Sequence, residues 1–552
     1  METARTERWA KVVDQTKCIG CHACTTACKS ENEVPLSVTR TFVKSVDAGR
    51  FPNARRSFQV TRCNQCDAAP CVTACPTSAM FRRPDGIVDF DKSACIGCKA
   101  CIAACPYDAI FINPDDHAAE KCNFCAHRLD IGLEPACVVV CPTGALTVGD
   151  MDDPESEVGR IVAREPVQVR RAEKETLPKL FYLGAGEVTL NPLAAENPGG
   201  DIFMWSDQGA GVGHHVPSGS PPSVRPASSS GPRLENGRRG NGRAPDRTPS
   251  GNASSAAAVI SYDVPHRAPW DFRVSAYTFT KSLAAGAYLL PLLLGVFGMM
   301  GADGPETGWS NPLWLTWAPV TALAFLLVTA GFLIWDLDRP ARFWLLLVRP
   351  QWRSWLVRGG FVITGFGILL TLHLALGLAG RREPTVWIAW LGAPLAVATA
   401  VYTAYLFAQA KARDLWQSPL LAPHLLVQAA LAGSALALVL LSLADFPAEG
   451  AMLVGSKWAF QAAVVFHVAL AFGEATTPHP TAHARLAARN MLRARYAGPY
   501  WTGMIATVAG LVAVTVTAGS GTASIMGACA ALVGLLLYEH AYVQAGQSVP
   551  LA

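Results

Sequence analysis

The stretches CIGCHACTTAC (residues 18–28) and CIGCKACIAAC (residues 95–105) are nearly identical and lie 77 positions apart. Each places four cysteines in the order C-x2-C-x2-C-x3-C, and Pro106 follows the second copy. In this pattern three closely spaced thiolates wrap one iron–sulfur cubane, while the fourth binds a different cluster. Such motifs must come in pairs, so the repeat predicts paired clusters.

Two longer cysteine motifs alternate with the short ones. They have the spacings C-x2-C-x4-C-x3-C-P and C-x2-C-x11-C-x3-C-P. The pieces CNQC and CPTSA of the first correspond to CNFC and CPTGA of the second. The alternation indicates an internal duplication of a two-cluster unit, and hence four [4Fe–4S] clusters. The candidate ligands are Cys18, Cys21, Cys24, Cys28, Cys63, Cys66, Cys71, Cys75, Cys95, Cys98, Cys101, Cys105, Cys122, Cys125, Cys137 and Cys141. Four zinc ions are the main alternative, but zinc sites usually use two separated C-x2-C pairs.

Composition separates this chain from ordinary soluble proteins. Hydrophobic residues make up 51% of the 552 residues and charged residues only 16%, which indicates membrane spans. The net charge of +4 gives no reason to expect a nucleic-acid partner. Of the 17 cysteines, 16 lie between Cys18 and Cys141, and neither a secretory signal nor a twin-arginine pair precedes them. We therefore expect a reducing compartment, where cysteines bind metal.

The chain divides into three regions. Residues 1–195 are mixed and cysteine-rich, with strand-like pieces such as GIVDF and AIFIN. Residues 196–268 are rich in Pro, Gly, Ser and Arg and predict a disordered linker, in which His214 and His215 are a solvated pair. Residues 269–552 contain eight apolar runs, each long enough to cross a bilayer as a helix. The predicted spans are 276–301, 314–335, 359–380, 386–408, 420–444, 451–472, 500–519 and 523–543.

The predicted fold is therefore an α+β, ferredoxin-like double-dicluster domain followed by an all-α integral membrane domain. Loop charges predict its orientation. Only Arg381 and Arg382 lie in the odd-numbered gaps, against eleven cations in the even-numbered gaps. These are Arg339, Arg342, Arg349, Arg353, Arg358, Lys411, Arg413, Arg485, Arg489, Arg493 and Arg495. We expect a bacterial-type cytoplasmic membrane protein with both termini and the cysteine domain on the cytoplasmic side.

Two resemblances cover all but the linker. Residues 1–195 resemble the four-cluster iron–sulfur subunit of the dimethyl-sulfoxide-reductase family, through CIGCHACTTACKSENEVP, RCNQCDAAPCVTACPTSAM, CIGCKACIAACPYDAI, KCNFCAHRLDIGLEPACVVVCPTGAL and LPKLFYLG. The rest is similar to a polysulfide-reductase (NrfD-like) membrane subunit, through FTKSLAAGAYLL, WDLDRPARFWLLLVRPQWRSWLVRGGF and YVQAGQSVPLA. The chain thus looks like a fusion of two subunits.

The first resemblance implies how the ligands are shared. It groups Cys141 with Cys18, Cys21 and Cys24; Cys28 with Cys122, Cys125 and Cys137; Cys105 with Cys63, Cys66 and Cys71; and Cys75 with Cys95, Cys98 and Cys101. It also implies that the first- and fourth-motif clusters face a molybdopterin-containing catalytic subunit. One of the second- and third-motif clusters would then be nearest the membrane.

The second resemblance implies a quinone site within the first four helices and no haem. Lys281, Asp336, Tyr402 and Tyr405 are the candidates, because a quinone needs hydrogen-bond donors and a group that exchanges protons. Each also has a structural interpretation: a snorkelling lysine, interfacial tyrosines, and an aspartate paired with an arginine of DLDRPAR. Glu474, Glu539 and His467 form a second candidate polar group, for a proton path.

These features favour an electron-transfer and membrane-anchor subunit that connects the quinone/quinol pool with a separate molybdopterin oxidoreductase. The alternative is a redox-driven proton-translocating module of a larger respiratory complex, which predicts buried carboxylates that link both membrane faces. A zinc scaffold without redox function is the third hypothesis. The partner's substrate, the quinone type and the direction of electron flow are not specified by the residues.

Overall fold

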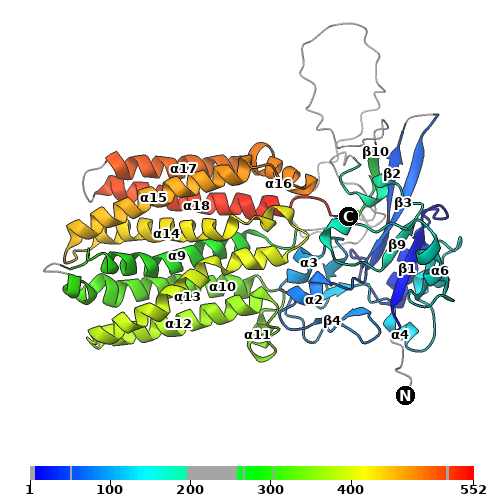
Figure 1. Cartoon of the computed structure of the whole chain (residues 1–552), viewed down its shortest axis with the longest axis horizontal. Helices are drawn as coiled ribbons and strands as arrows, with labels where there is room; N and C mark the ends of the chain where they lie inside the picture. The colour runs from blue at the N-terminus through cyan, green and yellow to red at the C-terminus, as the bar shows by residue number, and fades with distance from the viewer. Residues whose placement is uncertain are drawn as a thin grey trace, which may run out of the picture.

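The chain forms two parts that meet end to end. A domain of short strands and helices lies against one end of a bundle of long helices (Figure 1). The structure, a computed structural model, describes residues 7–49, 52–195, 258–264, 268–301, 305–516 and 521–551. The order of the two parts confirms the predicted fold class, an α+β domain followed by an all-helical membrane domain.

Short strands form two three-stranded sheets and two hairpins in the N-terminal part. The first sheet has the order β8-β1-β9, and the second has the order β10-β2-β3. The hairpins β4-β5 and β6-β7 contain the strands that GIVDF and AIFIN predict. The strands are β1 (Trp9–Asp14), β2 (Thr41–Ala48), β3 (Arg55–Arg62), β4 (Met80–Arg82), β5 (Val88–Phe90), β6 (Ile110–Ile112), β7 (Ala119–Lys121), β8 (Leu146–Asp150), β9 (Leu180–Leu183) and β10 (Ala258–Tyr262).

The sequence duplication is also visible in the backbone. The helices α1 and α3 begin at the same position of the two short motifs, after His22 and Lys99, which both have φ of 59°. Gly20 and Gly97, two residues earlier, have φ of 69° and 70°. Non-glycine residues rarely adopt this left-handed conformation, so its recurrence reflects one wrapping geometry used twice. The helices of this part are α1 (Ala23–Glu31), α2 (Pro70–Ala74), α3 (Ala100–Ala104), α4 (Ala126–Leu129), α5 (Ala136–Val139), α6 (Glu157–Arg164) and α7 (Glu187–Leu190).

Strand β10 lies inside the range 196–268 that the sequence predicts as a disordered linker. It pairs antiparallel with β2, and Ala258 and Ile260 pack against Val46 and Ala195. For residues 258–264 the prediction of disorder was wrong, because this apolar piece completes the edge of the second sheet. Residues 196–257 and 265–267, with His214 and His215, lie outside the described residues.

Among the described residues of the C-terminal part, eight helices are long and apolar enough to cross a membrane, as predicted. The largest difference in bounds is at the first, predicted at 276–301, because Asp271 caps its N-terminus by accepting a hydrogen bond from Arg273 N. The spans are α9 (Phe272–Val296), α10 (Ala318–Trp335) with the preceding turn Leu313–Trp317, α12 (Trp355–Leu378), α13 (Arg382–Gln409), α14 (Leu421–Leu443), α15 (Glu449–Thr476), α17 (Ala497–Val516) and α18 (Thr522–Gly546). Two shorter helices, α11 (Leu345–Val348) and α16 (Ala482–Arg493), lie at the end nearest the N-terminal domain (Figure 1).

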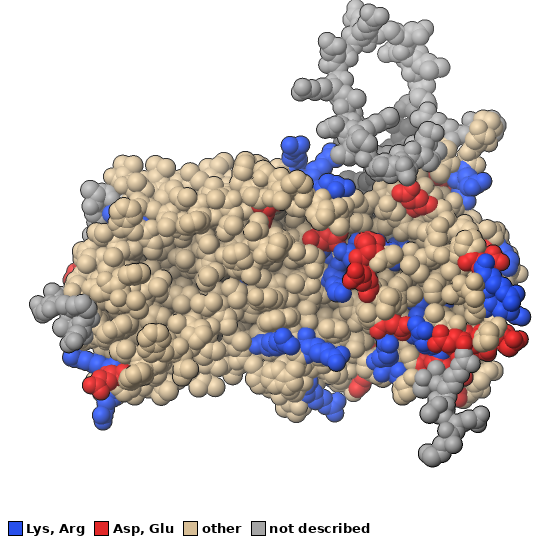
Figure 2. All heavy atoms as spheres, viewed as in Figure 1, with Lys and Arg blue, Asp and Glu red and all other residues tan. Residues whose placement is uncertain are grey.

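Charge is distributed as a membrane requires. The flank of the bundle seen in Figure 2 shows almost no Lys, Arg, Asp or Glu, whereas these residues gather at the two ends and on the N-terminal domain. Inside the bundle, small residues bring helices close together. A Cβ at Gly286 of α9 would lie 2.0 Å from the carbonyl oxygen of Ala429 on α14. Small residues at such crossings are typical of membrane helices.

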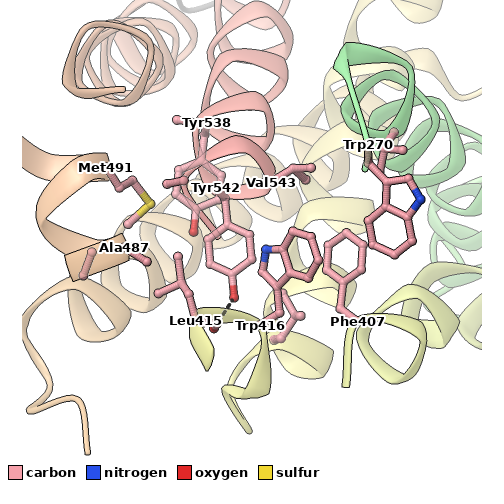
Figure 3. Packing of buried hydrophobic residues seen from close by; sticks show 14 of the residues in the cluster. Trp270, Phe407, Leu415, Trp416, Ala487, Met491, Tyr538, Tyr542 and Val543 are labelled. Carbon is pink, nitrogen blue, oxygen red and sulfur yellow. Dashed lines mark hydrogen bonds between the residues drawn. The ribbon is translucent and has the colours of Figure 1, made fainter. Parts of the chain in front are cut away.

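An aromatic cluster, drawn in Figure 3, lies at the end of the bundle that contacts the N-terminal domain. The rings of Trp270 and Phe407 both stack on Trp416, with centroids 5.4 Å and 4.5 Å away. Tyr542 of α18 donates a hydrogen bond to the carbonyl of Leu415 at 3.2 Å. This packing fixes the ends of α9, α13 and α18, which contact the iron–sulfur part.

Candidate functional site

The structure groups the cysteines across motifs in the combinations that the first resemblance implies. Three cavities are each lined by four cysteines, three from one motif and one from another. The sets are Cys28, Cys122, Cys125 and Cys137; Cys63, Cys66, Cys71 and Cys105; and Cys75, Cys95, Cys98 and Cys101. Cys18, Cys24 and Cys141 meet in one further cluster of side chains, and Cys21 lies beside Cys18.

These cavities fit cubane clusters better than zinc ions. A cubane takes one thiolate at each of its four iron corners, so four cysteines around a cavity are the expected arrangement. Among the described residues, no group of three or more His, Cys, Asp or Glu side chains is close enough to hold a single metal ion. The buried guanidinium of Arg62 donates from Nη1 to Cys137 Sγ at 3.0 Å, and its Nε and Nη2 find no partner in the described part of the chain. A buried cation of this kind requires an anionic neighbour.

The four sets follow one another in a row. Cysteines of consecutive sets are close enough for their charges to interact: Cys101 with Cys71, Cys63 with Cys122, and Cys137 with Cys24. One end of the row is buried, and the other end carries Cys21, which is exposed. The row therefore leads from the interior of the molecule to its surface.

The buried end of the row lies against the membrane bundle. Asp338 N donates to the carbonyl of Gly97 at 3.2 Å, and Trp270 Nε1 donates to the carbonyl of Cys98 at 3.3 Å. Gly97 leaves no space there, since a Cβ would lie 2.8 Å from Cβ of Asp338. The set containing Cys75, Cys95, Cys98 and Cys101 is thus the one in contact with the spans.

All three even-numbered loops contact the iron–sulfur part. Arg339, after the second span, donates to the carbonyls of Asp116 and Lys92, each at 2.6 Å. Asp414, after the fourth span, pairs with Lys174. After the sixth span, His483 Nε2 lies 3.0 Å from Arg171 Nη1. The arginine-rich loops and the cysteine domain are therefore on the same side of the bundle.

Two of the four candidate quinone-site residues lie together inside the bundle. Lys281 is fully buried; its Nζ donates to the carbonyl of Ala400 at 2.7 Å and to Thr403 Oγ1 at 2.9 Å. The same Nζ lies 5.2 Å from the ring centroid of Tyr402. The hydroxyls of Tyr402 and Tyr277 are buried and have no partner among the described residues. Lys281 is therefore an internal cation beside two free donors, not a snorkelling side chain.

The other two candidates lie elsewhere. Asp336, buried at the end of α10, pairs with Lys99 at 3.5 Å and Arg273 at 3.8 Å, and not with an arginine of its own loop. Burial raises the pKa of Asp336 to about 6, although Lys99 and Arg273 lower it. Tyr405 is 43% exposed on the outside of the bundle, where it stacks on Trp355 with centroids 4.4 Å apart. Tyr405 thus occupies the position of an interfacial tyrosine.

The second predicted polar group is divided between two places. Glu539 accepts from Thr278 Oγ1 at 2.8 Å and lies close enough to Lys281 for their charges to interact, so it belongs with the lysine. Glu474 and His467 are instead connected through His424, with Glu474 Oε2 3.2 Å from His424 Nδ1 and His467 Nδ1 2.9 Å from His424 Nε2.

Sequence reasoning missed the neutral partners of these charges. Tyr538 donates to Glu474 at 3.1 Å, and it precedes Glu539 directly, so one turn of α18 contacts both polar groups. Thr278 lies three residues before Lys281, and Thr403 follows Tyr402. These short spacings along single helices are the signal from which the sequence could have predicted the two threonines as neighbours of the charged group. The expected absence of haem stays a prediction.

Comparison with known proteins agrees with this geometry. Two models described as 4Fe-4S dicluster domain match residues 10–77 and 55–151, and the model described as polysulphide reductase, NrfD, matches residues 262–550. Two dicluster domains correspond to four [4Fe–4S] clusters.

Curated relatives match the N-terminal third. A component of the polysulfide reductase of Wolinella succinogenes is 46% identical over 180 residues, which are 32% of this chain and 94% of that protein. A component of the tetrathionate reductase of Salmonella typhimurium is 42% identical over 194 residues, 34% of this chain and 76% of that protein. The thiosulfate reductase electron transfer subunit PhsB of Salmonella typhi is 47% identical over 179 residues, 32% of this chain and 92% of that protein. The chain therefore belongs to the NrfD polysulphide reductase family, with an iron–sulfur subunit of the reductase type fused to its multi-pass membrane part.

Proposed function

We propose that this chain carries electrons between the quinone/quinol pool and a separate molybdopterin-containing catalytic subunit. The observation that carries the proposal is the row of four cysteine sets, which begins at the spans and ends at exposed Cys21. The sixteen cysteines hold one [4Fe–4S] cluster per set, in the groups described above. Clusters of this type accept and donate single electrons, and the protein determines their spacing and surroundings.

The catalytic partner binds at the exposed end of the row. Large apolar side chains are exposed there on α5 and in the loops beside α1 and α5: Ile19, Leu36, Ile131, Leu133, Val139 and Val140. The helices α1 and α5 pack against each other, so these side chains share one region. Exposed apolar groups of this size are typical of protein interfaces. Substrate chemistry takes place on the partner, whose substrate also decides the direction of electron flow.

Quinone exchange takes place near Lys281, Tyr402 and Asp336. The amine of Lys281 and the hydroxyls of Tyr402 and Tyr277 provide donors. Asp336 is close enough to both Tyr277 and Cys98 for their charges to interact. A bound quinone supplies two-electron, two-proton chemistry, so its neighbours must deliver or accept protons. Glu539, beside Lys281, is the carboxylate that exchanges protons with this group. Tyr405, on the outer surface, takes no part.

The iron–sulfur part lies on the cytoplasmic side of a bacterial-type inner membrane. Support comes from the eleven cations of the even-numbered loops against two in the odd-numbered loops. The structure adds a second reason for some of these arginines, because Arg339 and Arg342 bind backbone carbonyls of the iron–sulfur part. Protease added to intact spheroplasts tests the orientation: cleavage within residues 196–257 from the outside would contradict it.

One experiment tests the proposed function. Purified full-length protein is titrated anaerobically and followed by EPR, with quinol or with dithionite as the reductant. We expect both reductants to reduce the clusters in the wild type, and only dithionite to do so in Lys281→Met. Tyr405→Phe is the matched control and should behave as the wild type. Clusters that load but never respond to quinol in the wild type would contradict the quinone site, and a zinc-containing, colourless protein would contradict the cluster relay.

A further inference from the structure

One cysteine cavity differs from the others in the charge of its wall. Besides Cys28, Cys122, Cys125 and Cys137, it is lined by Lys11, Asn32, Arg40 and Arg62. Arg62 Nη1 lies 3.0 Å from Cys137 Sγ, and Lys11 Nζ lies 3.9 Å from the same sulfur. The two cations are 1% and 2% exposed. Both therefore act on this site with little screening by water.

A neutral donor also faces two other sulfurs of this set. Asn32 Nδ2 lies 3.6 Å from Cys28 Sγ and 3.8 Å from Cys125 Sγ. Arg40 Nη1 donates to Asn32 Oδ1 at 2.6 Å, which fixes the amide with its N–H groups towards the cysteines. Asn32 is thus positioned by Arg40 for its contact with the sulfurs.

The charges of Lys11 and Arg62 are not compensated. Within the described residues, neither forms an ion pair with a carboxylate, whereas Arg40 pairs with Glu120 and Lys99 of the membrane-end cavity pairs with Asp336 and Asp338. In the other three sets, the described hydrogen bonds to sulfur come from backbone N–H groups and neutral hydroxyls. Buried Lys121 directs its ammonium to the carbonyls of Val88 and Cys122, and its charge also acts on Cys63 and Cys71 without a described hydrogen bond to either sulfur.

Uncompensated cations favour the reduced state of a cluster, because reduction adds one negative charge beside them. Net charge and hydrogen bonds to sulfur are among the main determinants of iron–sulfur potentials. The adjacent set of Cys63, Cys66, Cys71 and Cys105 has a largely apolar wall that includes Ala69, Pro70, Val88, Pro106 and Ile110. Two cations thus lie at one sulfur of the Arg62 site, whereas Lys121 and Lys11 act on the neighbouring set without a described hydrogen bond to its sulfurs, so the Arg62 site stabilises an added electron better.

We propose that Arg62 and Lys11 raise the reduction potential of the cluster held by Cys28, Cys122, Cys125 and Cys137 above that of the neighbouring cluster held by Cys63, Cys66, Cys71 and Cys105. This inference rests on the proposed ligation of the four clusters. With both clusters bound, an electron on the neighbouring cluster would pass to the Arg62 site, oxidising the first and reducing the second, with no proton required. Of the two sites, the Arg62 site would therefore hold the electron at equilibrium as it moves between the membrane end and the exposed end of the row.

The test is an EPR-monitored redox titration of the cluster-loaded, full-length protein. Arg62→Gln replaces the charged guanidinium with a neutral amide that can still donate a hydrogen bond, and Arg62→Lys keeps the positive charge. We expect the midpoint potential of one EPR signal to be lower in Arg62→Gln than in the wild type. The expected shift is about 59 mV or more, which corresponds to a change of tenfold or more in the one-electron equilibrium constant. Arg62→Lys should recover most of this shift, and Lys11→Gln should move the same signal. Cys125→Ser assigns it, since the shifted signal must be the one that this variant alters.

Arg170→Gln is the matched control. Arg170 is also 1% exposed, but it donates to the carbonyls of Leu190 and Leu551 and lines none of the three cavities. All its signals should titrate as in the wild type. Unchanged potentials in Arg62→Gln and Lys11→Gln, an equal shift of every signal, or a shift of the signal altered by Cys105→Ser would overturn the inference while leaving the relay intact. If the wild type binds no iron, the proposed function itself fails, and iron content per chain distinguishes the two results.

Discussion

Replacing Asp414 by asparagine should loosen the iron–sulfur part from the membrane part. The Asp414 carboxylate is 4% exposed and pairs with Lys174 and, at 3.8 Å, with Arg171, while Thr481 donates to it at 2.6 Å. The substitution would leave two cations facing a neutral amide in a buried contact. Breaking a buried pair by removing one partner costs about 3–5 kcal/mol. Since Lys174 is 11% exposed and Arg171 retains Glu173, we expect the lower end, about 3 kcal/mol or roughly a hundredfold weaker docking.

The assay separates docking from covalent connection. A protease site is inserted within residues 220–240, the solubilised protein is cleaved, and retention of the N-terminal fragment on the membrane fragment is measured against salt. Asp414→Asn should release the fragment at lower salt than the wild type. Asp445→Asn, in an exposed loop at the far end, is the control. Equal retention of Asp414→Asn and wild type at every salt concentration would refute the assignment of docking energy to this pair.

The same pair predicts a pH dependence with a definite sign. Burial raises the pKa of Asp414, but Lys174, Thr481 and Arg171 together lower it by more than burial raises it. The net pKa is therefore below its ordinary value of 3.8. A lowered carboxyl pKa contributes stability above the unfolded pKa and loses it as the pH falls through the folded value. Docking through Asp414 should therefore be constant at neutral pH and weaken below about pH 4. Asp414→Asn should show a smaller loss over that range.

Three further outcomes are expected. Gly97→Ala should lose the cluster of Cys75, Cys95, Cys98 and Cys101 or the contact with the spans, measured by iron content and fragment retention, because its Cβ meets Asp338. Gly132→Ala is the control, because Gly132 has a similar φ of 76° but an added Cβ would have no atom within 4 Å. This variant should keep the cluster and the contact with the spans; equal losses in the two variants would attribute the effect to backbone strain alone. Ile131→Glu with Val139→Glu should weaken binding of the catalytic subunit in co-purification without changing iron content, and unchanged binding would place that interface elsewhere. In proteoliposomes, quinol oxidation by this chain should generate no membrane potential, measured with a voltage-sensitive dye, and a potential would favour the proton-translocating alternative.

The sequence was sufficient for features that are local along the chain. Cysteine spacing predicts that the first three thiolates of a short motif share a site and that the fourth binds elsewhere, and the repeated φ angles at Gly20 and Gly97 show that both motifs wrap alike. Which motif supplies the fourth ligand came from the family resemblance. The eight spans follow from length and hydropathy alone. In contrast, β10 was hidden because only its pairing with β2, more than 200 residues earlier, makes five weakly apolar residues a strand.

Side-chain neighbours inside the bundle depend on helix rotation, which hydropathy leaves open. Tyr402 and Tyr405 are three residues apart on α13, yet one is 3% exposed and the other 43%. Asp336 finds its partner Lys99 at a distance of 237 positions, across the interface between the two parts. Glu539 and Glu474 look equivalent in the sequence, but they contact different polar groups. Such assignments require the packed structure.

The depth of the polar groups bears on the two hypotheses for the membrane part. Lys281 lies nine residues after Phe272, the first residue of α9, and His467 lies nine residues before Thr476, the last of α15, so both are about 14 Å from the iron–sulfur end. This is about half of a hydrocarbon core of roughly 30 Å. On the far side of His467, the next buried side chains of α15 are Val464, Ala463 and Phe460, which pack with Leu283 and Leu431. If quinone binds near Lys281 and Glu539 as proposed, we expect its protons to exchange towards the side on which the cysteine row begins. Because the cysteine row connects to the bundle on that same side, electrons would enter or leave there as well, so we expect no net charge to cross the membrane and favour an electron relay over a proton pump.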